Sequence, residues 1–169
     1  MLHYSEQVGI FLSRFKEKVT AHYITILEKQ IKKCFVKLLH KKDFIKKVTI
    51  NPNSFHLELI ERKGVKIQPE TLSAGERQLL ATAIFWALII ESGIEAPIII
   101  DTPLGRLDSI HRKKIVENFF PKTGKQTILL STDEEITDNF ITYLKPNISC
   151  HYTIENKQDT FVSEFRKIS

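Results

Sequence analysis

The sequence of 169 residues predicts a mixed α/β protein. Apolar residues recur with a helical period over residues 5–40, the period becomes that of strands over 48–67, and strands then alternate with helices over 75–144. The chain is 42% hydrophobic and 27% charged, which is ordinary for a globular protein. We therefore expect one domain with an extended helical element at its start.

The first expected element is a long helix, and we assign residues 1–43 to it. The apolar steps over 5–40 are mostly three or four residues, and no Pro or Gly lies between residues 11 and 40. A helix of this length without internal caps indicates the root of a coiled coil or an arm packed on the body. An ordinary long domain helix is the alternative.

A small β-meander is expected next, over residues 44–70. Strands at 48–50 and 55–60 flank Asn51-Pro52-Asn53, whose residue types favour a turn. A short strand at 65–67 returns after a second turn that contains Gly64.

Residues 71–169 follow an α/β pattern. An apolar helix is expected over 75–92, and runs of β-branched residues at 97–101 and 126–130 predict two buried strands. Asp108 is a plausible N-cap for a helix over 109–118.

The last part of the chain predicts one more helix and two strands. Asp133 or its neighbour is expected to cap the helix, which runs to about residue 144 and stops before Pro146. Alternating residues at 149–154 and 160–165 predict the strands, with a turn at 157–159 between them.

The segment Leu72-Ser73-Ala74-Gly75-Glu76 is a small loop that opens into a helix. Gly75 lets backbone approach a ligand closely, Ser73 offers a hydroxyl, and the helix start presents unpaired N–H groups. These features suit a phosphate. An ordinary helix cap is the alternative.

Asp101 ends the apolar strand Ile98-Ile99-Ile100. In P-loop NTPases an Asp at the end of a buried strand holds Mg²⁺, usually through water. Asp101 follows Ser73 by 28 residues, across one helix, and precedes Pro103 and Leu107-Asp108. This ordered set is more specific than either motif alone.

Three strings together resemble the C-terminal lobe of an SMC-like ABC ATPase head. They are TLSAGERQLL, PIIIDTPLGRLDS and TILLSTDEEI, which in that family are the signature motif, the Walker B strand with the D-loop, and the switch region. More narrowly, DTPLGRLDS, NFFPK and LLSTDEEI resemble the DndD family, ATPases of bacterial DNA phosphorothioation systems. The detailed match covers residues 71–136, and a looser one continues to residue 165.

The resemblance implies a role for each matched position. By this resemblance the nucleotide-binding residues of the signature loop are Ser73, Ala74, Gly75 and Glu76, of which Ser73 and Gly75 would contact the γ-phosphate of ATP bound by a second head. Asp101 would serve the Mg²⁺ of this head's own nucleotide. Gly105 and Asp108 belong to the D-loop at the dimer interface, and Ser131 and Thr132 belong to the switch region.

Two positions depart from the general ABC pattern. Thr102 stands where a catalytic Glu usually follows the Walker B Asp, and Thr132-Asp133 occupies the region of the switch His. A hydroxyl of ordinary pKa orients water but is a poor base, so Thr102 is an incomplete substitute. Asp133 and Glu134 are further candidates for activating water, and capping of the next helix is the alternative role for both.

The sequence contains no Walker A loop of the form GxxxxGK[ST]. Gly124-Lys125 is followed by Gln126, and Phe119 stands where the first Gly is required. We therefore expect this chain alone neither to bind ATP tightly nor to hydrolyse it. The simplest explanation is the C-terminal part of a longer protein, and a naturally split head is the alternative. The expected partners are the missing N-terminal lobe and a second copy of the head.

The net charge of +5 is unevenly distributed. Residues 1–66 contain 14 Lys and Arg against 6 Asp and Glu, whereas residues 67–169 contain 11 against 14. A basic arm on a near-neutral body suggests a polyanion such as DNA, with a solvated helix face as the alternative. The candidate DNA contacts are Lys29, Lys32, Lys33, Lys37, Lys41, Lys42, Lys46 and Lys47.

The remaining features point to a reduced, cytoplasmic location. Cys34 and Cys150 are far apart and lack a CxxC partner, no run reaches 18 apolar residues, and the N-terminus does not resemble a secretory signal. No membrane partner is expected.

The expected function is that of an ATPase head, with ATP and Mg²⁺ as cofactors, which dimerises around ATP and acts on DNA. The DndD resemblance implies support of DNA phosphorothioation together with other sulfur-modification proteins. Alternatives are a DNA-repair SMC-like ATPase acting with a nuclease, a non-hydrolysing scaffold, and a protein-interaction module.

Overall fold

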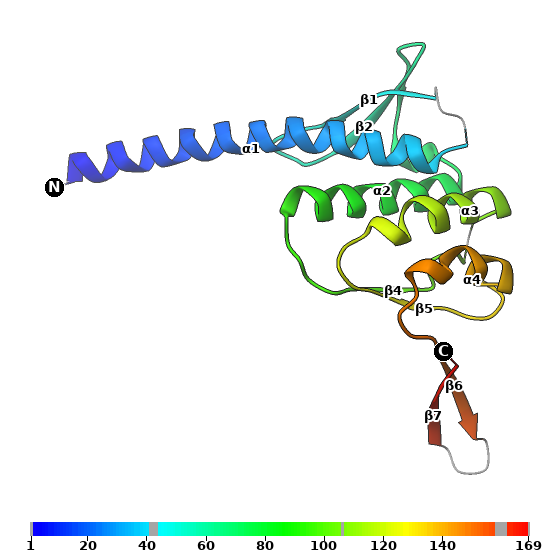
Figure 1. Cartoon of the computed structure of the whole chain (residues 1–169). Coiled ribbons are helices and arrows are strands. Elements are labelled where there is room, and N and C mark those ends of the chain that lie inside the picture. Colours follow the sequence, from blue (N-terminus) through cyan, green and yellow to red (C-terminus); the bar gives the residue numbers. More distant parts are fainter. Residues whose placement is uncertain (1, 41–43, 106, 158–161, 169) are drawn as a thin grey trace.

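A computed structural model of the chain describes residues 2–40, 44–105, 107–157 and 162–168 (Figure 1). A long helix is followed by a three-stranded sheet, then by helices that lie beside a parallel pair of strands, and last by a hairpin that extends from the body. The helices and strands are α1 Leu2–Leu38, β1 Ile45–Ile50, β2 Leu57–Glu61, β3 Lys66–Ile67, α2 Ala74–Ser92, β4 Ile98–Asp101, α3 Ser109–Asn118, β5 Thr127–Leu130, α4 Asp138–Leu144, β6 Tyr152–Lys157 and β7 Val162–Lys167.

Helix α1 has two parts with different surroundings. Its first half extends beyond the body, where Val8, Phe11 and Phe15 are exposed (Figure 1). Its second half packs on α2 and buries Ile31 and Phe35 completely. The predicted long helix is confirmed, and it ends at Leu38; residues 41–43 of the predicted span lie outside the described residues.

The β-meander is confirmed as an antiparallel sheet in the order β1-β2-β3. Val48 and Leu59 are paired neighbours on its buried face, which packs toward the core. One hydrogen bond ties the sheet to α1, because the Ile50 amide donates to Glu28 Oε1 at 2.8 Å. The meander is thus fixed on the packed half of α1.

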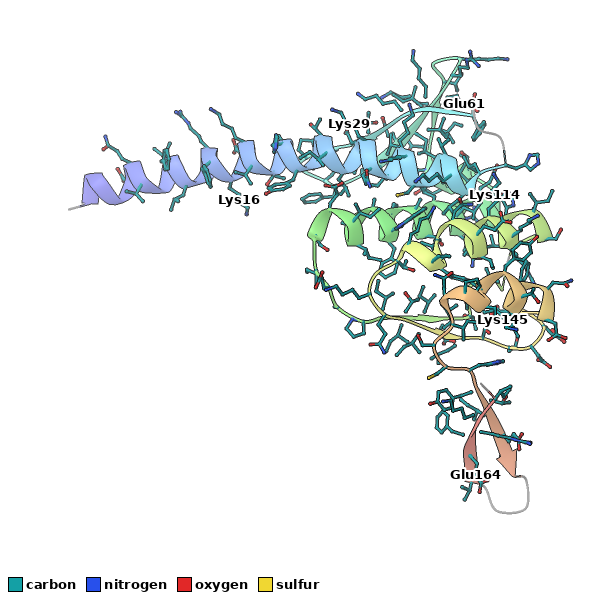
Figure 2. All side chains as sticks on the ribbon, viewed as in Figure 1. Lys16, Lys29, Glu61, Lys114, Lys145 and Glu164 are labelled. Carbon is teal, nitrogen blue, oxygen red and sulfur yellow. The ribbon has the colours of Figure 1, made fainter. Side chains whose placement is uncertain are left out.

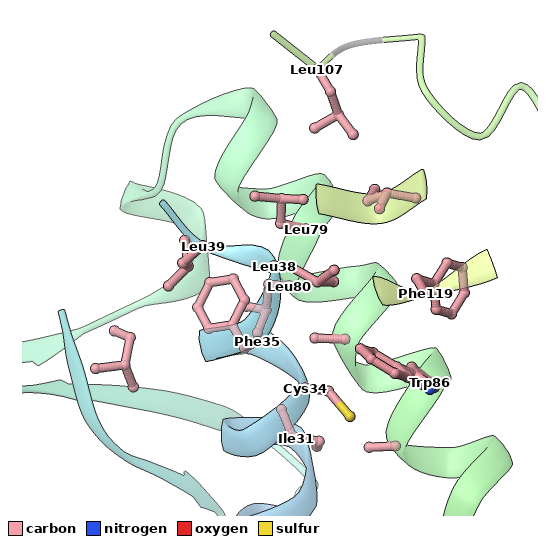
Figure 3. Packing of buried hydrophobic residues seen from close by; sticks show 14 of the residues in the cluster. Ile31, Cys34, Phe35, Leu38, Leu39, Leu79, Leu80, Trp86, Leu107 and Phe119 are labelled. Atoms are coloured by element: carbon pink, nitrogen blue, oxygen red, sulfur yellow. The ribbon is translucent and has the colours of Figure 1, made fainter. Parts of the chain in front are cut away.

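The core lies between α1, α2 and α3 (Figure 3). Phe35 and Leu38 from α1 face Leu79 and Trp86 from α2, and the Trp86 ring meets Phe119 edge-on at 5.6 Å between centroids. Each such buried side chain contributes about 1.5–3 kcal/mol of hydrophobic stabilisation. This cluster holds the start of α2, and therefore the signature loop, in place.

Strands β4 and β5 pair in parallel, but the prediction that both are fully buried is wrong. Ile98 and Ile100 face the core, whereas Ile99 is 64% exposed, and Ile128 and Leu130 on β5 are also exposed. A β-branched run indicates helices on both faces of a sheet. Within the described residues, only one face of this pair is covered.

Helix α3 is confirmed over Ser109–Asn118, with Asp108 as its N-cap. The start predicted for the next helix is wrong, because α4 begins at Asp138 with Thr137 as its N-cap. Residues 132–136 instead form a turn, in which the amides of Glu135 and Ile136 both donate to the Thr132 carbonyl at 3.1 Å. The acidic residues of this segment therefore lie in a loop.

The final two strands, β6 and β7, form an antiparallel hairpin that extends from the body (Figure 1). Part of the turn predicted at residues 157–159 lies outside the described residues. No helix in the described part of the chain combines the length and apolar character required to cross a membrane.

Candidate nucleotide half-site

The signature loop is held by a capping box at the start of α2. The Ser73 hydroxyl accepts a hydrogen bond from the Glu76 amide at 3.3 Å, while the Glu76 carboxylate accepts from the Ser73 amide at 3.0 Å and from its hydroxyl at 2.7 Å. Ser73 and Ala74 are exposed, and Gly75 is half-buried. The sequence therefore presents a rigid helix N-terminus to solvent, as a phosphate contact requires.

The Arg77 side chain binds the backbone that leads into the signature loop, a role that was not predicted from the sequence. Its Nη1 donates to the carbonyl oxygens of Glu70 at 3.1 Å and Leu72 at 2.7 Å. These two bonds fix the turn that leads into the loop. A basic residue directly after a signature-like string was the available signal.

Asp101 and Thr102 lie at the carboxyl end of β4. Asp101 is exposed there, and Thr102 adopts a φ of 45°, in the left-handed region that costs a non-glycine residue about 1–3 kcal/mol. The Thr102 amide donates to the Leu130 carbonyl at 2.9 Å, which retains this conformation. Strain of this kind gathers at functional sites.

The fit of Asp101 to Mg²⁺ follows from the preference of that ion. Mg²⁺ keeps several waters and takes one or two carboxylates together with substrate phosphates. Among the described residues, no three His, Cys, Asp or Glu side chains are grouped to form an all-protein metal site. A single exposed carboxylate at a strand end suits a nucleotide-bound Mg²⁺ better than a structural metal.

Asp108, for which the sequence predicts a D-loop role, forms its hydrogen bonds within its own chain. Its carboxylate accepts from the His111 amide at 2.9 Å and lies 2.8 Å from His111 Nδ1. The backbone hydrogen bond from His111 is the main cause that holds the pKa of Asp108 below its usual value. The carboxylate therefore orients the start of α3, and its exposed position leaves it at the surface.

The switch region lies against the D-loop. Arg112 joins the two segments, because its Nε donates to the Leu107 carbonyl at 2.9 Å and its Nη1 donates to the Glu134 carbonyl at 3.2 Å. Ser131, Thr132 and Asp133 are exposed, as is the Glu134 side chain. The switch-region residues that the sequence singled out thus point to solvent.

A pocket of about 630 Å³ lies between these segments, lined by Ala74, Arg77, Gln78, Thr102, Gly105 and Glu135. It joins the start of α2, the end of β4, the D-loop and the switch region. Of the residues predicted for the site, Ala74, Thr102 and Gly105 line it, whereas Asp101, Asp108 and Asp133 do not.

Glu135 and Gln78 are pocket residues that the sequence reading missed. Glu135 is only 7% exposed, and its Oε2 has no hydrogen-bond partner among the described residues. Gln78 donates to the Pro103 carbonyl at 3.4 Å, and its buried Oε1 likewise lacks a partner within the described chain. Three consecutive acidic residues look alike in the sequence, so nothing there distinguished Glu135.

The candidate DNA-contacting lysines occupy two elements. Lys29, Lys33 and Lys37 recur every four residues on one face of α1, and Lys29 lies on the part of that helix beside the three-stranded sheet (Figure 2). The Lys37 ammonium lies 5.4 Å from the centre of the Trp86 ring. Lys32 is half-buried, Lys46 and Lys47 are exposed on β1, and Lys41 and Lys42 lie outside the described residues.

Comparison with known proteins identifies the fold. No protein-family model matches the chain, and no curated protein does. One similar solved structure is described as the structural biochemistry of ATP-driven dimerization and DNA-stimulated activation of SMC ATPases. Its sequence is 17% identical to this chain and its TM-score is 0.67. The match covers 90% of this chain and 89% of that chain.

Two archaeal head structures are also similar. The Smc head domain with an extended coiled coil from Pyrococcus furiosus, bound to the C-terminal domain of ScpA, is 15% identical with a TM-score of 0.70. The Smc head domain with a coiled coil and joint from Pyrococcus yayanosii is 18% identical with a TM-score of 0.72. Each match covers 97% of this chain but only 40% and 31% of those chains, respectively.

The fold is therefore that of the C-terminal lobe of SMC head domains, and the matches that cover 97% of the chain include the long helix α1. The α/β class predicted from the sequence is confirmed at this level.

Proposed function

We propose that this chain is the C-terminal half of an SMC-like ATPase head that dimerises around ATP and acts on DNA. One observation carries the proposal: an exposed, capped helix N-terminus at Ser73 and an exposed carboxylate at Asp101 occur together in the fold of an SMC head. The first suits a phosphate, and the second suits a nucleotide-bound Mg²⁺. Similar heads are described in terms of ATP-driven dimerization and DNA-stimulated activation, which agrees with this combination.

In this proposal the two motifs serve different nucleotides. Asp101 holds the Mg²⁺ that accompanies ATP in its own head, whereas the Ser73 loop meets the γ-phosphate of ATP held by the second head. The amides at the start of α2 supply partial positive charge, and the Ser73 hydroxyl supplies a hydrogen bond when it turns from the Glu76 carboxylate, to which it donates in this structure. ATP thus joins two heads across a two-fold axis, and hydrolysis releases them.

Catalysis belongs to the intact protein in this proposal. The sequence has no Walker A loop, whose Lys and backbone cradle provide most of the contacts to the phosphates. We therefore expect the purified chain to lack ATPase activity until it is joined to an N-terminal lobe. A non-hydrolysing scaffold is the second candidate, favoured by Thr102 at the usual position of the catalytic Glu.

The more specific part of the proposal is a role in DNA phosphorothioation. It is supported by the resemblance of DTPLGRLDS, NFFPK and LLSTDEEI to the DndD family. In that setting the head acts with other sulfur-modification proteins, and its ATP-driven opening and closing moves the coiled coil relative to DNA.

A substitution at Ser73 tests the half-site without removing the helix cap. Ser73→Asp keeps an N-cap residue but replaces the hydroxyl with a negative charge that repels the γ-phosphate. In the full-length protein we expect Ser73→Asp to abolish ATP-dependent dimerisation, measured by light scattering with and without ATP. ATP binding to its own Walker site is expected to remain.

Ser73→Thr is the matched control, because it keeps both the hydroxyl and the cap, and it is expected to dimerise. Asp101→Ala is expected to remove Mg²⁺-dependent hydrolysis. A full-length protein that dimerises equally well with Ser73→Asp contradicts the half-site, and one that dimerises but never hydrolyses ATP favours the scaffold.

A further inference from the structure

The switch loop presents three consecutive carboxylates, and only one of them faces inward. Asp133 and Glu134 are exposed, whereas Glu135 is 7% exposed and lines the pocket that Thr102 also lines. Thr102 occupies the position at the end of β4 where a stronger base is missing. Glu135 therefore brings a carboxylate to the pocket lined by Thr102, where the sequence lacks the usual catalytic Glu.

The position of Glu135 is maintained by backbone contacts on both sides. Its own amide donates to the Thr132 carbonyl at 3.1 Å, and Arg112 binds the carbonyl of the preceding residue, Glu134, at 3.2 Å. Because Arg112 also binds the Leu107 carbonyl at 2.9 Å, the switch loop is fixed relative to the D-loop. The carboxylate is thus held by structure that does not use its own oxygens.

Space for the carboxylate depends on a glycine. A Cβ built on Gly105 would lie 2.7 Å from Glu135 Oε1, closer than real Cβ contacts allow. A methyl group at position 105 would therefore require the end of the Glu135 side chain to shift. The observed position of the Glu135 carboxylate therefore depends on the absence of a side chain at Gly105.

The oxygens of Glu135 have the properties of a proton acceptor. Glu135 lines the pocket, and its buried Oε2 has no hydrogen-bond partner among the described residues, so the lone pairs of that oxygen are not used by another group described in the chain. Arg77 is the charged group that lines the same pocket from α2. A carboxylate that lines the same cleft as a strained residue at a strand end is in a suitable location for a general base.

We propose that Glu135 is the carboxylate that activates the attacking water in the intact head, with Thr102 orienting that water and Arg112 acting as a positioning residue. This inference rests on the proposed ATPase function. In the step itself, the water oxygen bonds to the γ-phosphorus and one water proton passes to Glu135. The bond from the γ-phosphorus to its bridging oxygen breaks, and the electron pair leaves with ADP. Glu135 then releases the proton to phosphate or solvent.

The test compares isosteric substitutions at the three acidic positions in the full-length protein. Glu135→Gln is expected to lower kcat by about 100-fold or more, the usual contribution of a general base, while KM and ATP-dependent dimerisation stay close to wild type. Glu134→Gln and Asp133→Asn test the two other candidate carboxylates, and a loss of kcat in either of them with Glu135→Gln near wild type overturns the assignment. Glu117→Gln, an exposed carboxylate on α3, is the matched control and is expected to keep kcat within about threefold. Glu135→Asp, which keeps a carboxylate, is expected to recover part of the activity.

Each outcome decides the question. Activity of Glu135→Gln within threefold of wild type overturns the proposal, and so does a loss of dimerisation that accompanies the loss of hydrolysis. If Glu135→Gln does not fold, Glu135→Asp replaces it, because the shorter side chain withdraws the carboxylate from its place in the pocket: a kcat lowered about tenfold with ATP-dependent dimerisation retained supports the proposal, and an unchanged kcat overturns it. A wild-type protein that neither dimerises nor hydrolyses ATP instead contradicts the proposed function.

Discussion

At the scale of single residues, burial separates side chains that the sequence treats as equals. Glu135 is buried while Asp133 and Glu134 are exposed, because the turn at residues 132–136 directs successive side chains to different sides. The two cysteines differ in the same way. Cys34 is buried between α1 and α2, whereas Cys150 is exposed before β6.

The cysteines give a prediction at this scale. Burial raises the pKa of the Cys34 thiol to about 11, so at pH 8 only about one molecule in a thousand carries the thiolate there. We expect a thiol reagent to modify Cys150 rapidly in the folded protein and Cys34 only after denaturation. Mass spectrometry before and after denaturation checks this, with Cys150→Ser as the control. Equal labelling of both thiols in the folded state contradicts the burial of Cys34.

At the scale of elements, α2 connects the core to the half-site. One end of this helix presents the capped signature loop, and its middle buries Trp86 and Leu79 against α1 and α3. The position of the loop therefore depends on packing that is several turns away along the same helix.

Two neighbouring positions on α2 test this dependence. Trp86→Ala is expected to lower the free energy of unfolding by about 3–5 kcal/mol, because Trp86 is 2% exposed and fills the core beside Phe119. Phe85→Ala is the matched control: Phe85 is 43% exposed, and we expect a decrease of about 1 kcal/mol or less. Urea unfolding followed by circular dichroism measures both, and similar decreases at the two positions would contradict the packing.

At the scale of the whole molecule, charge and exposed apolar surface are unevenly distributed. The basic residues concentrate in α1 and the meander, and apolar side chains are exposed on the first half of α1, on one face of the β4–β5 pair and on the final hairpin. The body of the molecule thus carries a basic arm that the motifs of the half-site do not require.

The arm gives a prediction about DNA. Neutralising Lys29, Lys33 and Lys47 with Gln is expected to weaken DNA binding by the full-length protein. The slope of log K against log salt is expected to become shallower by about 0.9 for each DNA phosphate that these lysines neutralise in the wild-type protein. The matched control neutralises Lys113, Lys122 and Lys145, three basic residues away from the arm. Fluorescence anisotropy at several salt concentrations measures DNA binding by both variants. An unchanged slope for the arm variant would contradict the DNA contact and favour the alternative, in which these lysines only form a solvated helix face.

The sequence by itself determined the order of the elements and the motifs, because these depend on local order. The apolar period of α1, the capping residues Ser73 and Asp108, and the spacing from Ser73 to Asp101 are all properties of neighbours along the chain. Only the tertiary structure decided which face of β4 is covered, where α4 begins and which carboxylate enters the pocket. These outcomes depend on contacts between distant segments, such as Arg112 with Glu134 and Gly105 with Glu135. Local sequence holds no record of such contacts, so only the fold distinguished the buried carboxylate of Glu135 from its two exposed neighbours.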